Sequence, residues 1–192
     1  MAARLTLICH ASTDAVRKAA FSADEPIDRR DEADAAELAK RLPRADQCWT
    51  SPELRTRQTG QLLKLDALVL PQLRDCDYGA WKGRTFEEVL ARDLKGVEAW
   101  LRDPAAVPHG GESLSTLMQR VAHWLDSEKA ADRRSILVTH ASIVRAAIVH
   151  AIEATPKSFW RIDVAPLSVT RLSGNDGRWN LVSTGCILRG DA

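Results

Sequence analysis

The sequence predicts an α/β fold, a three-layer α/β/α sandwich built on a mostly parallel central sheet. Two short apolar runs, residues 5–9 and 135–139, are typical of strands that are buried on both faces. Segments with helical apolar spacing lie between and after these runs, as in chains whose helices cover a sheet. The 192 residues, 45% of them hydrophobic, suffice for one core, so we expect a single domain over residues 1–192.

Apolar spacing predicts three of the helices. Apolar residues between Ala36 and Leu42 mark the first helix, and those from Leu114 to Leu125 recur at helical intervals along the second. The third covers residues 143–152, with Ser142 as the expected N-cap and Pro156 as the residue that stops it.

Two further segments have patterns of their own. Residues 168–172 and 179–182 flank Gly174-Asn175-Asp176-Gly177, which predicts a β-hairpin with a glycine-rich turn. Residues 14–34 are polar and irregular, and we expect a mobile loop there.

Composition limits the partners and the compartment. The 27 Lys and Arg residues nearly balance 26 Asp and Glu residues without a basic block, so nucleic acid is not an expected partner. The four cysteines form no CxxC pair, which argues against a zinc cluster or a disulfide framework and fits a reducing cytoplasm. The apolar run at residues 5–9 is too short for a signal peptide or a membrane span, so we expect a cytoplasmic protein without a membrane partner.

The two predicted strands end in the same pattern, Cys9-His10-Ala11-Ser12 and Thr139-His140-Ala141-Ser142. Ligands of α/β sheets bind at the carboxyl ends of strands, and a helix that begins there offers free N–H groups to a phosphate. We therefore expect two imidazoles to meet beside an anion site. The alternative is that each histidine only caps its strand and bonds a neighbouring loop.

Five segments, in order, resemble motifs of the histidine phosphatase superfamily, whose fold is phosphoglycerate mutase-like. They are residues 7–13 (LICHAST), 51–59 (SPELRTRQT), 73–83 (LRDCDYGAWKG), 109–113 (HGGES) and 138–141 (VTHA). The resemblance implies a phosphatase in which His10 attacks phosphorus and forms a phosphohistidine.

The same resemblance assigns further roles. Arg55 would hold the phosphoryl oxygens, His140 would add a donor, and Asp75 would act as acid and then as base. His109 and Ala141 fall at substrate-binding positions. Neither a metal ion nor a cofactor is implied.

This sequence departs from the family's pattern at the nucleophile. Cys9 occupies the position of the arginine that precedes the histidine, so the grip on phosphate and the activity should be reduced. Arg17, in the following loop, is a candidate to supply the missing guanidinium. Asp75 is shorter than the family's glutamate and needs a raised pKa to act as an acid near neutrality.

The resulting prediction is a metal-independent phosphomonoesterase of reduced activity, acting on a small phosphorylated metabolite. The segment from Thr85 to Gly111 that would roof the pocket is short, which favours a phosphatase over a mutase. Inorganic phosphate is a second expected ligand, and a homodimer is left open.

Three alternatives accompany this prediction. Cys9 as a nucleophile would need Cys-x5-Arg, whereas Arg17 gives Cys-x7-Arg. Cys9, His10, Asp75 and His140 are acceptable zinc ligands. The main alternative is a degenerate family member that binds a phosphorylated ligand or partner without turnover.

Overall fold

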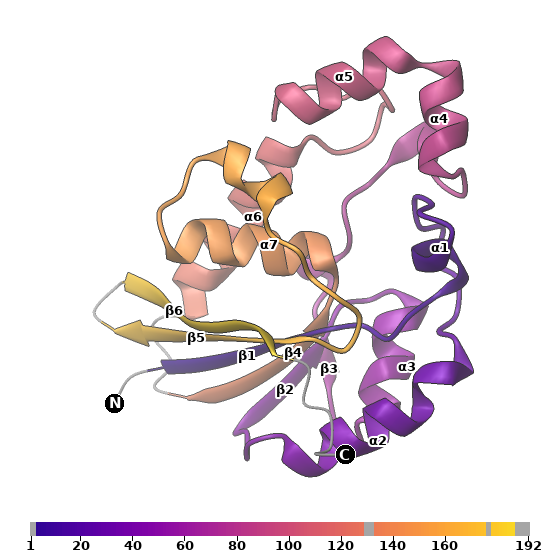
Figure 1. The fold of residues 1–192 in the computed structure, drawn as a ribbon. Coiled ribbons are helices and arrows are strands. Elements are labelled where there is room, and N and C mark those ends of the chain that lie inside the picture. Colours follow the sequence, from indigo (N-terminus) through magenta and orange to yellow (C-terminus); the bar gives the residue numbers. More distant parts are fainter. Residues whose placement is uncertain (1–2, 129–132, 176–177, 187–192) are drawn as a thin grey trace.

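The computed structural model describes residues 3–128, 133–175 and 178–186, and its centre is a six-stranded sheet (Figure 1). The strand order is β3-β2-β4-β1-β5-β6, parallel from β3 to β1 and antiparallel from β1 to β6. The strands are β1 (Ala3–Cys9), β2 (Gln47–Thr50), β3 (Leu68–Val69), β4 (Arg134–Thr139), β5 (Val169–Asn175) and β6 (Arg178–Cys186). The predicted α/β class and mostly parallel sheet are confirmed.

Helices lie on both faces of this sheet. Helices α6 (Leu114–Glu128) and α7 (Ala141–Ala151) cover one face, and α2 (Glu32–Arg41) and α3 (Leu54–Leu62) lie against the other (Figure 1). Each face of the sheet has its own hydrophobic core, and successive residues of β1 pack into different cores because side chains alternate along a strand. Leu7 packs toward α6 and α7, whereas Ile8 packs toward α2 and α3.

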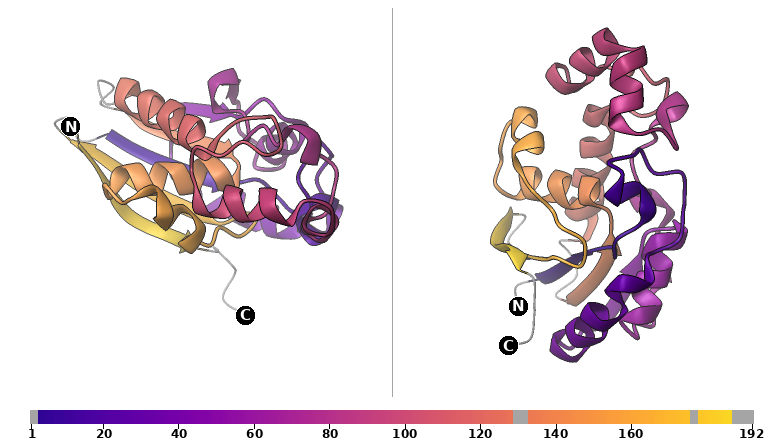
Figure 2. Two further views of the ribbon diagram at one scale, coloured as in Figure 1. Left: turned by 90° about the horizontal axis from the view of Figure 1, so that it is seen from above. Right: turned by 45° about the vertical axis from the view of Figure 1, so that its right-hand side comes forward.

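Two short helices form a lid over the carboxyl ends of the central strands. Helices α4 (Phe86–Arg92) and α5 (Leu94–Arg102) stand apart from the other helices (Figure 2). An aromatic cluster fixes them, with the ring centroids of Trp81 and Trp100 5.6 Å apart and those of Phe21 and Trp81 5.2 Å apart. The lid is therefore packed on its own small core.

The structure corrects two predictions about loops and helix ends. Residues 14–34 are not a continuous irregular loop, because they contain α1 (Asp14–Arg17), η1 (Arg29–Asp31) and the first residues of α2. Polar caps explain the local structure: Thr13 Oγ1 accepts a hydrogen bond from the backbone of α1.

The predicted ends of the third helix were also wrong. The N-cap of α7 is His140 rather than Ser142, which lies in the first turn. The helix ends at Ala151, ahead of Pro156, because Glu153 adopts a positive φ of 52°. Pro156 instead begins the 3-10 helix η4 (Pro156–Arg161).

The C-terminal hairpin prediction is confirmed for its two strands, which pair as β5 and β6. Asp176 and Gly177 of the predicted turn lie outside the described residues. Strands β2 and β3 and helices α3, α4 and α5 were not predicted. Among the described residues, no helix combines the length and the hydropathy needed to span a bilayer.

Candidate functional site

Two histidines meet where the central strands end. His10 follows β1 and His140 follows β4, and these strands are neighbours in register, with Cys9 opposite Thr139. The ring centroids lie 5.4 Å apart, and both side chains are buried. The identical sequence patterns thus place two imidazoles side by side.

The surroundings of His10 select one tautomer. Its Nδ1 lies 2.7 Å from the backbone oxygen of Ala11, so Nδ1 carries the proton and donates to that oxygen. Nε2 then keeps its lone pair, and no described residue hydrogen-bonds it. Burial, helped by His140 and Arg55, lowers the pKa of His10 to about 3, so the ring is neutral.

The loop after His10 is held by the next motif along the chain. The Ala11 N–H donates to Thr59 Oγ1 at 2.9 Å, and the same hydroxyl donates to the backbone oxygen of Arg55 at 2.7 Å. These bonds attach the loop that follows His10 to α3.

Arg55 is a buried cation, and two of its guanidinium nitrogens have no hydrogen-bond partner. Only 1% of the residue is exposed, and its Nη2 donates to Asp75 Oδ2 at 2.6 Å. Its Nε and Nη1 have no hydrogen-bond partner, although Nη1 lies 3.9 Å from Asp24 Oδ1. Because a buried unpaired donor costs free energy, these atoms suit an incoming anion.

Asp75 connects several parts of the site. Its Oδ1 accepts from the Ser142 hydroxyl at 2.6 Å and from the Cys76 N–H at 2.8 Å. Burial raises the pKa of this carboxyl, but His140, Arg55 and the hydrogen bonds outweigh burial and hold the pKa well below its usual range. Asp75 is therefore ionised here and lacks the raised pKa that an acid acting near neutrality would need.

Glu53 is a site residue that the sequence did not reveal. Its Oε2 lies 2.7 Å from His140 Nε2, and its Oε1 accepts from the Asp75 N–H at 3.0 Å. Burial raises the pKa of Glu53, but the bond to His140 prevails and lowers it. The other ring nitrogen, His140 Nδ1, has no hydrogen-bond partner and lies 3.6 Å from Asp75 Oδ2.

A cleft of about 370 Å³ opens beside Arg55 and Asp75. Charged side chains of both signs line it: Asp24, Glu53, Arg55, Arg74, Asp75, Asp77 and Lys82. This mixture suits a small polar ligand with an anionic group.

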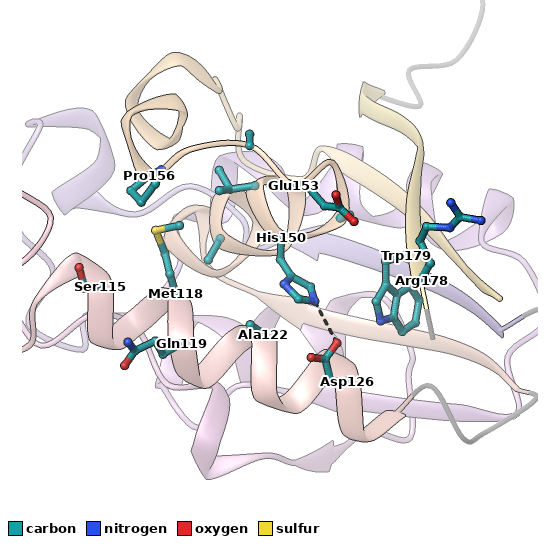
Figure 3. Close-up of a pocket in the computed structure, with 14 residues that line it drawn as sticks. Ser115, Met118, Gln119, Ala122, Asp126, His150, Glu153, Pro156, Arg178 and Trp179 are labelled. Atoms are coloured by element: carbon teal, nitrogen blue, oxygen red, sulfur yellow. Dashed lines mark hydrogen bonds and ion pairs between the residues drawn. The ribbon is translucent and has the colours of Figure 1, made fainter. Parts of the chain in front are cut away.

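The two clefts with the largest volumes, both above 600 Å³, lie away from the histidine pair. One, of about 620 Å³, runs between α6, α7 and β6, where His150 bonds Asp126 at 3.0 Å (Figure 3). The other, of about 660 Å³, lies at the amino ends of β1 and β4. Neither is lined by His10, Arg55 or His140.

Cys9 is buried, and its backbone groups bond the chain just before β5. Its N–H donates to the Ser168 oxygen at 3.1 Å, and its own oxygen accepts from the Leu167 N–H at 3.1 Å. Burial, with Asp75 nearby, raises the pKa of the thiol to about 12, and the N–H of Ala141 only partly opposes this. The thiol stays protonated at neutral pH, which argues against a thiolate nucleophile.

Arg55 lines the cleft of about 370 Å³, but the other predicted binding residues, Cys9, Arg17, His109 and Ala141, do not, and neither do His10 and His140. Arg17 forms ion pairs with Asp14, at 2.9 Å, and with Asp28, so its guanidinium does not fill the space beside Cys9. His109 packs under the lid, its ring centroid 5.0 Å from that of Trp81, and its Nδ1 accepts a bond from Gly111.

Two motif glycines let the base of the lid cross the segment that follows Asp75. Gly79 has a φ of 45°, and a Cβ there would lie 2.1 Å from the His109 oxygen. A Cβ on Gly111 would lie 2.0 Å from the Asp77 oxygen, which accepts from the Glu112 N–H at 2.7 Å. Only glycine fits such a close crossing.

Arg120, on α6, is a second residue that sequence reasoning missed. Its Nη2 donates to the backbone oxygens of Arg74 and Asp75, at 2.8 and 3.1 Å, and its Nε donates to Glu112 at 2.7 Å. No motif marks it, because its targets are carbonyl groups distant in sequence. It fixes the backbone that carries Asp75.

The zinc alternative finds no support in the described part of the chain. Residues 3–128, 133–175 and 178–186 contain no group of three or more His, Cys, Asp or Glu side chains placed to hold a metal ion.

Two curated proteins illustrate what this sequence is similar to. A bifunctional protein of Mycobacterium tuberculosis is 32% identical over 111 residues, which are 56% of this chain and 30% of that relative. Phosphoserine phosphatase 1 of Hydrogenobacter thermophilus is 26% identical over 168 residues, covering 82% of this chain and 80% of the enzyme. This chain thus spans less than a third of the first relative and most of the second.

A solved structure supports the fold. The α-ribazole phosphatase of Shigella flexneri superposes with a TM-score of 0.86 at 23% identity, covering 98% of this chain and 99% of that one. The sequence profile of the histidine phosphatase superfamily (branch 1) matches residues 5–187. The chain therefore belongs to the histidine phosphatase superfamily.

Proposed function

We propose that this chain is a phosphomonoesterase that transfers the phosphoryl group of a small phosphorylated metabolite to His10. One observation carries the proposal: the unbonded Nε2 of a neutral His10 lies in a site with buried donors that lack partners. These donors are Nε and Nη1 of Arg55, and the ring nitrogen Nδ1 of His140 also lacks a partner. A phosphoryl group would satisfy them.

In the first step, the lone pair of His10 Nε2 forms a P–N bond as the P–O bond to the leaving alkoxide breaks. Asp75 gives the alkoxide its proton. The carboxyl is ionised in the empty site, but the bound phosphoryl group adds negative charge and competes for Arg55, and both effects raise the pKa of Asp75. Substrate binding thus favours the protonated form of Asp75 that this step requires.

In the second step, water attacks the phosphohistidine. Asp75, now a carboxylate, takes a proton from the water as the new P–O bond forms and the P–N bond breaks. Inorganic phosphate leaves, and His10 returns to its neutral form with Nδ1 bonded to Ala11.

We propose reduced activity because Cys9 stands where the family motif has an arginine. The thiol is buried and uncharged, so it contributes no charge-assisted bond to the phosphoryl oxygens. Arg17, held by Asp14 and Asp28, does not replace that arginine. The reaction uses groups of this chain alone and should proceed in the presence of a chelator.

The substrate class rests on size, charge and the relatives. The cleft of about 370 Å³ has room for a small metabolite. Curated relatives include a phosphoserine phosphatase and a glucosyl-3-phosphoglycerate phosphatase, both named for small phosphorylated compounds.

Rapid-quench labelling tests the proposal. A ³²P-labelled aryl phosphate, quenched within one turnover, should leave an acid-labile and base-stable label on the wild-type protein. His10→Ala should leave none, whereas His123→Ala, which changes an exposed histidine of α6, should label normally. Wild-type hydrolysis without any such label would rule out the phosphohistidine route.

A non-catalytic phosphate-binding protein is the second candidate. The pairs Arg55–Asp75 and His140–Glu53 favour it, because a carboxylate already neutralises the Arg55 guanidinium and a second carboxylate already occupies Nε2 of His140. In that case phosphate raises the melting temperature by binding the folded state, while a screen of phosphate esters yields no turnover above that of His10→Ala.

A further inference from the structure

A second charged cleft lies at the end of the sheet opposite His10. Its volume is about 660 Å³, within the range of small-molecule sites. Four arginines line it: Arg4, Arg44, Arg134 and Arg171. The described lining residues include no acidic side chain.

The strand register places three of these arginines together on one sheet face. Arg4 of β1 lies directly beside Arg134 of β4. On the other side, Arg4 pairs with Ser173 and Thr6 pairs with Arg171, so Arg4 and Arg171 are diagonal neighbours. Diagonal neighbours of this kind lie about 7 Å apart, within reach of long side chains.

The protein compensates this positive charge only in part. Arg134 has an acidic partner, Asp46, at 3.4 Å. Arg4, Arg44 and Arg171 have no carboxylate partner among the described residues. Like charges side by side on a sheet are destabilising, and a bound anion removes that repulsion.

The remaining lining residues indicate which groups a ligand would carry besides an anionic one. Thr6 and Ser173 bring hydroxyl groups, and Ala45, Ile136 and Val182 bring apolar surface. Val182 lies at a register shift in the β5–β6 pairing, between Leu181, which pairs with Leu172, and Ser183, which pairs with Arg171.

We propose that this cleft binds a small multivalent anion, with phosphoryl groups held by the arginines and a compact apolar group on the neighbouring aliphatic surface. The site is separate from the histidine pair: Arg4 and His10 lie at opposite ends of β1, about 20 Å apart at the usual rise of a strand. The proposal therefore does not depend on the proposed function.

Titration followed by backbone amide NMR tests it, with adenosine diphosphate and inorganic pyrophosphate as probes at physiological salt. We expect saturable shifts of the Arg4, Thr6 and Ser173 amides, with the nucleotide binding more tightly than pyrophosphate. The variant Arg4→Gln/Arg171→Gln should bind at least tenfold more weakly at these amides.

The control is Arg178→Gln, which removes one charge from β6 outside the cleft (Figure 3). It should bind as the wild type does. Without ligand, the double variant should melt at or above the wild-type temperature, because the repulsion between the two arginines is removed. If the double variant does not fold, the single variants Arg4→Gln and Arg171→Gln are tested in its place.

Three outcomes would overturn the proposal: no saturable shift at these amides, equal weakening in Arg178→Gln, or tighter binding of a single-stranded oligonucleotide than of the nucleotide. The last would indicate a nucleic-acid surface instead. Shifts confined to Ser142 and His140 would report phosphate at the histidine pair and count equally against it.

Discussion

Arg55 Nη2 lies 2.6 Å from Asp75 Oδ2, so the cation that should grip a phosphoryl group is already bonded to the carboxylate that should protonate the leaving group. Both side chains are largely buried, with 2% and 14% of their surface exposed. A substrate anion must compete for the guanidinium, and success releases the carboxylate from its strongest hydrogen-bonding cation. In the proposed mechanism, this one pair therefore couples phosphate binding to acid catalysis.

Asp75→Asn tests the coupling. The amide keeps the shape but neither repels an anion nor supplies a proton, so inorganic phosphate should inhibit at lower concentration while kcat falls by about a hundredfold or more for an alkyl ester. An activated aryl ester, whose leaving group needs little protonation, should lose much less. Equal losses of kcat for the two ester types would contradict an acid role for Asp75.

Glu53→Gln should strengthen the binding of anionic esters. Glu53 holds a negative charge 2.7 Å from His140 Nε2, close to where the phosphoryl group would lie. Removing one charge there should lower KM about fivefold, equivalent to about 1 kcal/mol. Steady-state kinetics at pH 7 measures this, with Glu37→Gln on the surface of α2 as the control. A raised KM would show that Glu53 instead orients His140 for binding.

The buried neutral His10 predicts a specific dependence of stability on pH. Its pKa of about 3 in the folded protein lies below the 6.5 of an unfolded chain, so the unfolded state takes up a proton first. The stability that His10 contributes is fully present above pH 6.5 and is lost as pH falls toward 3. The slope is about 1.4 kcal/mol per pH unit in that window.

Urea unfolding at pH 7.5, 6.0 and 5.0 measures this slope. His10→Gln should have a shallower dependence by about that amount per pH unit, because glutamine does not titrate. His123→Gln, which changes an exposed residue, should follow the wild type. Parallel curves for wild type and His10→Gln would mean that His10 titrates normally in the folded state.

Cys9→Arg should increase kcat/KM for an aryl phosphate by roughly thirtyfold, since about 2 kcal/mol of charge-assisted bonding to the phosphoryl group would be gained. Arg17→Ala should change kcat/KM by less than about twofold, because Arg17 is engaged by Asp14 and Asp28. A large loss in Arg17→Ala would mean that the loop rearranges when substrate binds. Thermal melting of each variant separates lost folding from lost activity.

The sequence predicted the centre of the molecule better than its periphery. His10 and His140 were paired correctly because each follows an apolar run long enough to identify a buried strand. Strand β3 has only two residues, both exposed, so it carries no burial pattern from which to predict it. The lid helices take their stability from aromatic contacts with distant segments, such as Phe21 against Trp81.

Within the candidate site, motif residues were found and their partners were not. Arg55 and Asp75 occupy positions to which the motifs assign a role. Glu53 lies in the same motif segment as Arg55 but at a position without an assigned role, and Arg120 lies outside every motif; both act through contacts with residues far away in sequence. Arg120 reaches the Asp75 oxygen across a separation of 45 positions. Ser142 was predicted to cap α7, but its hydroxyl instead donates a hydrogen bond to Asp75.

The crossing of Gly79 and Gly111 has a mechanical consequence. The lid rises from residues that are in backbone contact with the chain just beyond Asp75, at the Glu112 to Asp77 hydrogen bond of 2.7 Å. No side chain separates the two backbone segments at Gly79 and Gly111. A ligand large enough to displace the lid would therefore also move the backbone that carries Asp75, the proposed acid.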